Sequence, residues 1–107
     1  MVFVEFPNFT KRVTELLDDE DYRRLQAALI VNPELGDLIR GTGGLRKARW
    51  SAEGRGKRGG MRVIYYWLTK RHQLLMLLIY PKSARDDLTA NERKLLAKLV
   101  ERELANG

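Results

Sequence analysis

The sequence has 107 residues, of which 44% are hydrophobic and 32% are charged, and its net charge at pH 7 is +6. This length predicts one domain over residues 1–107, and this apolar content excludes an intrinsically disordered chain. With no cysteine and one histidine, the chain lacks the residues for a disulfide scaffold, a thiolate zinc site or a histidine cluster, so we expect neither a metal nor another cofactor.

A strand and two helices are predicted for the amino-terminal part of the chain. Residues 2–6 alternate weakly and are rich in β-formers, which predicts a short strand. Apolar residues at helical spacing over 9–17 predict an amphipathic helix. Asp18 or Asp19 can cap a second helix, which ends before Pro33 because the residue preceding a proline avoids the α region.

Three strands are predicted after a glycine-rich break at residues 41–44. Residues 45–50 and 61–68 have the pattern of strands and are joined by a basic, glycine-rich loop over 51–60. Residues 74–80 are apolar at every position, which predicts a central strand with both faces covered. The short connections between these strands favour antiparallel pairing.

A final helix is predicted after a capping box, in which Thr89 and Glu92 satisfy each other's backbone amides. The apolar stripe that docks this helix consists of Leu95, Leu96, Leu99 and Val100. The order of elements therefore predicts an α+β fold, β-α-α-β-β-β-α, with a small, mainly antiparallel sheet packed against helices.

The sequence predicts a cytoplasmic protein with no membrane partner. Its first residues show no basic segment followed by a long apolar one, which a secretory signal would need. The longest apolar run, Leu74 to Tyr80, is far shorter than the roughly 20 residues of a membrane-spanning helix.

Positive charge is concentrated in the middle of the chain. Residues 40–82 carry 11 basic side chains and one acidic side chain, Glu53, whereas residues 1–39 carry four basic and eight acidic ones. Concentrated charge of this kind attracts polyanions and speeds their encounter. The alternative interpretation is a solvated surface that happens to be basic.

Side chains alternate between the two faces of a strand, which predicts where this charge gathers. Lys47 and Arg49 share a face of the first central strand, opposite to Trp50, which we expect in the core. The neighbouring strands can present further residues to the same concave surface. The converging set consists of Lys47, Arg49, Arg62, Tyr80 and Lys82.

A basic face of this kind suits RNA, because guanidinium and ammonium groups bind phosphates and aromatic rings stack on unpaired bases. The loop over 54–60 has the composition to close over a phosphodiester backbone; the alternative is a hairpin loop that its charge keeps soluble. Tyr66 and its neighbours are also typical of core and sheet-edge positions. The candidate RNA-binding residues are Arg46, Arg55, Lys57, Arg58, Tyr66 and Tyr80.

RNA cleavage needs a base for the 2′-hydroxyl, an acid for the leaving oxygen and cations for the charge that develops on phosphorus. His72 falls in a turn that we expect at the far edge of the sheet, and Glu53 is more typical of a charge partner in a loop. A lysine is then the remaining base, with Lys47 and Lys82 as the candidates. The alternative for each lysine is a phosphate contact only.

Several segments together resemble the RelE/ParE toxin superfamily, with the HigB-type branch as the nearest match. They are residues 32–37, 41–49 and 56–66, followed by 79–82 and 86–89. The resemblance implies a RelE-like fold and the toxin of a type II toxin–antitoxin pair. It also implies an endoribonuclease, or mRNA interferase, that enters the ribosomal A site, cuts the mRNA there without a metal and so inhibits translation. The implied partners are a cognate antitoxin, the 30S A site of the ribosome and mRNA.

The same resemblance assigns roles to individual residues. Lys47 and Arg49 match the family's basic pair, Arg62 matches the arginine that stabilises the transition state, and Lys82 matches the basic residue after the last strand. The family often has a stacking tyrosine at the start of the last helix. Here Leu88 stands nearest, and Tyr80 or Tyr66 would take that role. Two alternatives stay open: a DNA gyrase inhibitor of the same fold, like ParE, and a non-catalytic RNA-binding module.

Overall fold

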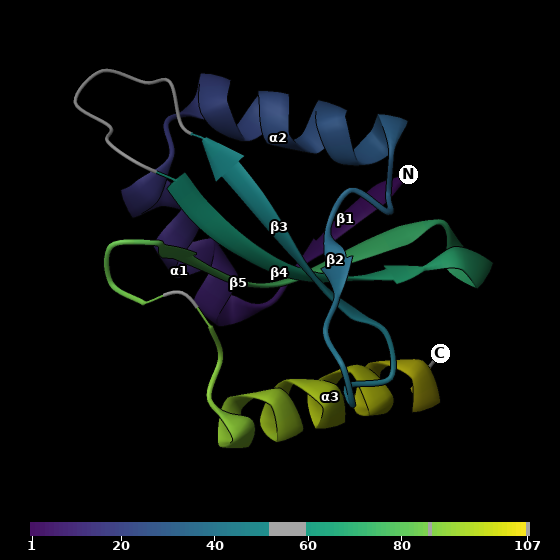
Figure 1. The fold of residues 1–107 in the computed structure, drawn as a ribbon. Helices are drawn as coiled ribbons and strands as arrows, with labels where there is room; N and C mark the ends of the chain where they lie inside the picture. Colours follow the sequence, from purple (N-terminus) through teal and green to yellow (C-terminus); the bar gives the residue numbers. More distant parts are fainter. Residues whose placement is uncertain (52–59, 86, 107) are drawn as a thin grey trace.

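The computed structural model describes residues 1–51, 60–85 and 87–106. Its order of elements confirms the predicted α+β arrangement and adds one short strand (Figure 1). The elements are β1 (Val2–Glu5), α1 (Pro7–Leu16), α2 (Asp19–Val31), β2 (Asp37–Leu38), β3 (Leu45–Ser51), β4 (Gly60–Leu68), the 3-10 helix η1 (Thr69–Arg71), β5 (Gln73–Pro81) and α3 (Ala90–Ala105).

The strands form one sheet in the order β1-β5-β4-β3-β2. The pairs β2–β3, β3–β4 and β4–β5 are antiparallel, as predicted for the three central strands, whereas β1 runs parallel to β5. The strand that the sequence did not predict is β2, because two residues are too few to show an alternating pattern. The sheet is therefore mixed but mainly antiparallel.

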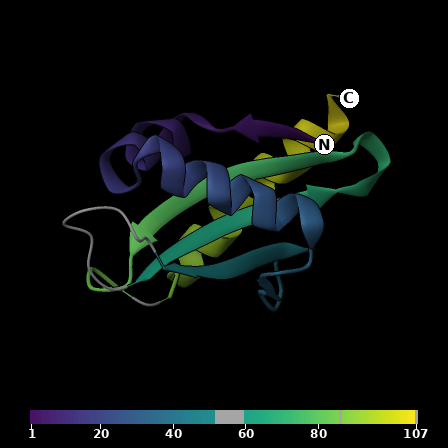
Figure 2. The ribbon, with the colours of Figure 1, turned by 90° about the horizontal axis from the view of Figure 1, so that it is seen from above.

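Helices cover both faces of the sheet. Figures 1 and 2 show α1 and α2 on one face and α3 on the other. The first core joins Phe9 and Leu25 to side chains of the central strands, and the second joins Leu96 and Val100 to the opposite face. Strand β5 lies between β1 and β4, and its side chains contribute to both cores. Both faces of its continuous apolar run are therefore covered, as the sequence predicted.

A β-bulge in β5 decides which side chains reach the α3 face. The pairing with β4 shifts between Ile64 and Tyr65, so that Leu77 has no partner in the register. Leu75 and Leu77 face α3, and beyond the bulge Tyr80 does so as well. The extra residue reverses the alternation, as bulges do, and thereby brings Tyr80 onto the same face as the basic residues.

The helix ends follow the capping chemistry of the sequence, with one correction. The Asp18 side chain accepts a hydrogen bond from the Asp21 amide at 2.8 Å and caps α2. Pro7, expected to follow a strand and precede a helix over 9–17, instead forms the first turn of α1. A proline fits there because the first helical amides have no intrahelical acceptor.

The capping box of α3 gives a stability prediction. The Thr89 hydroxyl accepts from the Glu92 amide at 3.1 Å, and the Glu92 carboxylate accepts from the Thr89 amide at 2.8 Å. Thr89→Ala should therefore lower the free energy of unfolding by about 1 kcal/mol. Urea denaturation measures this, with Thr14→Ala on the exposed side of α1 as a control that changes it by less than about 0.5 kcal/mol. Equal losses in the two variants would contradict the capping role.

Candidate functional site

The sheet register brings three of the predicted basic residues, Lys47, Arg49 and Arg62, together on the α3 face. Arg49 on β3 lies directly opposite Arg62 on β4, and Arg62 lies opposite Tyr80 on β5. Lys47 is two residues from Arg49 and shares its face. Lys82 follows β5, and its amide donates to the Gly60 carbonyl at 2.9 Å, which continues the ladder. Three of the four predicted catalytic side chains thus come from the neighbouring strands β3 and β4, and the fourth, Lys82, comes directly after β5.

Arg62 is the buried member of this set. Only 5% of its surface is exposed, and its Nη1 donates to the Met61 carbonyl at 3.4 Å. A Cβ at Gly60 would lie 3.4 Å from the same nitrogen, so the glycine leaves room for the guanidinium. A cation held in this way needs little reorganisation when charge develops beside it.

Two carboxylates contact Lys47 and Arg49. Asp87 contacts the Lys47 Nζ at 2.6 Å, and Asp37 contacts Arg49 at 3.6 Å. Lys47 is mostly covered, with 15% of its side chain exposed, whereas Asp87, Arg49 and Asp37 are open to solvent. The hydrogen bond from Lys47 holds the pKa of Asp87 below its usual range, so this carboxylate is ionised near neutral pH.

These ion pairs border a pocket of about 200 Å³ between β2, β3 and the start of α3. Three apolar side chains and five charged ones form its walls. The lining residues are Asp37, Leu38, Ile39, Lys47, Arg49, Asp87, Leu88 and Arg93. The predictions from sequence missed Asp37, Asp87 and Arg93, because charged residues next to helix starts and short strands are usually solvated.

Tyr80 is covered by an arginine that the sequence interpretation also missed. The Arg85 guanidinium carbon lies 4.6 Å from the centre of the Tyr80 ring, and Arg85 also pairs with Glu92 on α3. Tyr80 itself is 4% exposed. Its ring lies beside Arg62 as expected but is not open to a base in this structure.

Tyr66 lies away from the basic residues, towards the other end of β4. It pairs with Leu45 and Leu75, and its ring would lie 2.8 Å from a Cβ at Gly44. Neither predicted tyrosine therefore forms an open stacking platform beside the cations.

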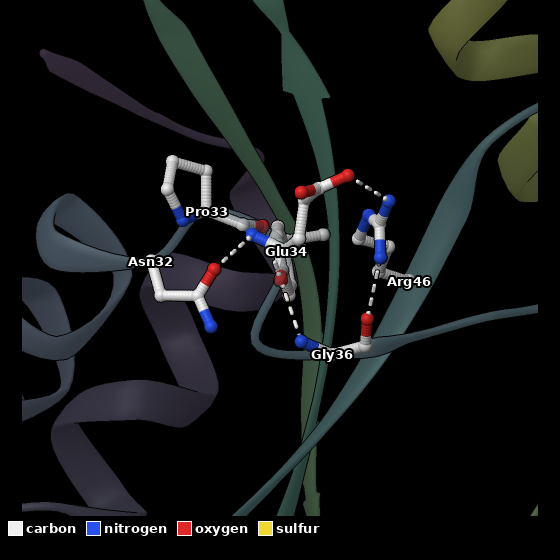
Figure 3. Close-up of polar contacts among 6 residues, drawn as sticks. Asn32, Pro33, Glu34, Gly36 and Arg46 are labelled. Atoms are coloured by element: carbon white, nitrogen blue, oxygen red, sulfur yellow. Dashed lines mark hydrogen bonds and ion pairs between the residues drawn. The ribbon is translucent and has the colours of Figure 1, made fainter.

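Arg46 also points away from the predicted site. It lies opposite Tyr65 in the β3–β4 ladder, on the other face from Lys47. Its guanidinium donates to the Gly36 carbonyl at 2.8 Å and pairs with Glu34 at 3.3 Å, as Figure 3 shows. Arg46 thus contacts the loop before β2 and lies apart from the other predicted cations, and its RNA contact stays a prediction.

Tyr65 fixes the same loop from inside the core. Its hydroxyl donates to the Pro33 carbonyl at 2.6 Å and accepts from the Gly36 amide at 2.9 Å. Gly36 is required here, because a Cβ would lie 2.9 Å from the Tyr65 ring and from the Lys47 backbone. This close packing holds β2 against β3 and thereby sets Asp37 beside Arg49.

Tyr65→Phe should destabilise the protein by about 1–3 kcal/mol, because the buried Gly36 amide loses its acceptor. Burial raises the pKa of Tyr65 above its ordinary value of 10.0. The contribution of the neutral Tyr65 hydroxyl to the free energy of unfolding is therefore fully present below about pH 10. It is lost as the pH rises through the raised pKa of the folded state. Chemical denaturation as a function of pH measures both effects. Tyr66→Phe is the matched control, and an equal loss there would contradict this role.

Some sequence predictions fall elsewhere. Arg55, Lys57 and Arg58, with Glu53, lie outside the described residues. His72 is exposed in the turn between η1 and β5, at the end of β4 away from Arg62, as expected.

In residues 1–51, 60–85 and 87–106, no three histidine, aspartate or glutamate side chains cluster as ligands for a metal ion. None of the helices in these ranges combines the length and the apolar character needed to span a bilayer.

Comparison with known proteins identifies the family. A family model described as the RelE toxin of the RelE/RelB toxin–antitoxin system matches residues 8–106. A solved structure of a double mutant of the toxin RelE from E. coli, in the free state, matches with a TM-score of 0.56. The two chains are 13% identical, over 79% of this chain and 86% of that chain. This likeness confirms the RelE-like fold, and the match over nearly the whole sequence shows that the chain belongs to the RelE toxin family.

Proposed function

We propose that this toxin is a ribosome-dependent endonuclease of the HigB type that cleaves mRNA in the ribosomal A site and so inhibits translation. The observation that carries the proposal is the alignment of Arg49 and Arg62 across neighbouring strands, with Lys47 on the same face. Three cations on one face of neighbouring strands attract a phosphodiester, which would have to compete with Asp87 and Asp37 for Lys47 and Arg49.

The chemistry is transfer of the phosphate within the RNA. The 2′-hydroxyl gives its proton to a base and attacks the adjacent phosphorus, an O2′–P bond forms, the P–O5′ bond breaks, and the departing O5′ takes up a proton from an acid or from water. The products carry a 2′,3′-cyclic phosphate and a 5′-hydroxyl. Arg62, with its planar and permanently charged guanidinium, stabilises the negative charge on the phosphate oxygens in the transition state. Lys47 and Lys82 are the candidates for the base that takes the 2′-hydroxyl proton.

Membership of the family implies a cognate antitoxin. We propose that this antitoxin neutralises the toxin by covering or distorting the basic face, or by preventing binding to the ribosome through its bulk. Co-purification of an untagged antitoxin with the tagged toxin tests the pairing.

The test of the proposed activity is controlled expression in bacteria, with mRNA 5′ ends mapped by primer extension soon after induction. Cuts within translated codons, absent from untranslated regions of the same messages, support A-site cleavage. Growth arrest with a DNA-damage response and no cuts would favour a gyrase inhibitor of the same fold. Salt-sensitive RNA binding without any product would favour a non-catalytic binding module.

A further inference from the structure

The pocket beside the basic residues has the size of a small planar ligand. Its volume of about 200 Å³ lies below the roughly 300–1,000 Å³ typical of sites for drug-sized ligands. Leu38, Ile39 and Leu88 give it apolar walls, and charged groups face them. A flat ring with polar edges satisfies both kinds of wall, whereas a phosphate alone would leave the apolar side chains unused.

Arg93 is the one pocket cation to which the ion-pair pattern of the described residues gives no partner. Lys47 and Arg49 each pair with a carboxylate. The Arg93 guanidinium, from the first turns of α3, has no hydrogen bond or ion pair with the described part of the chain, although its charge acts on Asp87. A half-buried guanidinium that faces a pocket and has no partner among the described residues is a donor available to a ligand.

The donor and acceptor groups of the pocket fit one nucleobase best. Arginine binds the O6 and N7 acceptors of guanine with two hydrogen bonds, and the neighbouring edge of guanine carries N–H donors for a carboxylate. Asp37 is a carboxylate on the wall of the same pocket, and it is 79% exposed despite its contact with Arg49. Uracil offers no amino group to a carboxylate, and adenine offers arginine only one of these two acceptors. Cytosine carries its amino group and its acceptors on one edge, whereas guanine presents them on separate edges to the two side chains.

We propose that this pocket is a guanine subsite, in which Arg93 binds the O6/N7 edge and Asp37 accepts from the other edge. The proposal rests on the proposed function, because it makes the pocket the binding site for one base of the cleaved RNA. Lys47 and Arg49 form the wall towards Arg62. A base held in the pocket therefore has its own sugar-phosphate beside the cations that act on the reaction. Leu88 and Ile39 would contact the ring where other nucleases use an aromatic side chain.

Binding of mononucleotides tests the pocket without any requirement for cleavage. Amide and arginine Nε resonances of the labelled toxin are followed by NMR while GMP, AMP, CMP, UMP or inorganic phosphate is added. GMP should shift resonances of Ile39, Leu88 and Arg93 and bind about tenfold more tightly than UMP, as a paired arginine and guanine do. Arg93→Gln should abolish this preference, whereas Lys98→Gln, which removes one charge from the exposed side of α3, should preserve it. Equal binding of all four nucleotides and phosphate would overturn the subsite.

The cleavage sites then distinguish an RNA base from a free nucleotide as the natural ligand. If the pocket reads RNA, the wild-type toxin should favour guanine at one fixed position relative to the cut, and Arg93→Gln should lose that preference by about tenfold. A guanine preference unchanged in Arg93→Gln, or no preference in the wild type, would overturn the RNA subsite even where GMP binds. Absence of all cuts with intact GMP selectivity would refute the proposed nuclease but leave the guanine pocket established.

Discussion

Arg62→Ala is expected to slow mRNA cleavage by about 10²–10³-fold, the usual loss when one preorganised donor to a developing oxyanion is removed. Arg62 is 5% exposed and lies between Arg49 and Tyr80 in the sheet register, so no mobile surface cation can take its position. Growth inhibition on induction and the yield of mapped 5′ ends measure the effect, and they should fall together.

The control experiments separate catalysis from folding. Arg62 is buried, and its loss also removes packing and a hydrogen bond, so thermal unfolding of each variant must be measured. Arg62→Lys keeps the charge without the planar fork and should retain part of the activity. Arg23→Ala, at a position 72% exposed on α2, removes an arginine from the opposite side of the sheet and should cut like the wild type. A folded Arg62→Ala protein with full toxicity would refute the mechanism.

The fold was accessible from the sequence because most of its elements carry strong periodic patterns. The capping box at Thr89, the continuous apolar run of β5 and the helical spacing from Phe9 each predicted the observed element. The short strand β2 and the parallel pairing of β1 were not predicted. Both depend on contacts between distant segments, such as that of Tyr65 with the loop before β2, which leave no local pattern.

Of the residues around the candidate site, the sequence predicted the cations but not their acidic partners. Alternation along the strands grouped Lys47 with Arg49, and the observed register adds Arg62 directly opposite. The carboxylates that hold these cations come from segments distant in sequence, since Asp87 precedes α3 and lies 40 residues from Lys47. The concentration of basic residues over 40–82 predicted a basic face. The structure shows instead cations paired with acids, which changes what RNA must displace in order to bind.

The second prediction concerns the ion pair between Lys47 and Asp87. Loss of Lys47 should slow cleavage, whereas loss of the Asp87 charge should tighten RNA binding. Lys47→Ala should slow cleavage by about 10²-fold, because the site loses a candidate base for the 2′-hydroxyl or, if Lys82 is the base, a cation beside the phosphate. Asp87→Asn should tighten binding of a short single-stranded RNA by about twofold to fivefold, because the phosphate no longer competes with a carboxylate for the ammonium group. Fluorescence anisotropy at fixed salt measures binding, and primer extension measures cleavage.

The pH dependence follows from the same contact. Because Lys47 holds the pKa of Asp87 low, the ion pair persists at neutral pH and is lost only as pH falls through that lowered value. The ratio of RNA affinities between Asp87→Asn and the wild type should therefore stay constant between about pH 5 and 8 and shrink only in stronger acid. If the ion pair had only a structural role, Lys47→Ala and Asp87→Asn would both be less stable than the wild type and would both bind RNA more weakly. That result would show that Asp87 supports the site and does not compete with RNA for it.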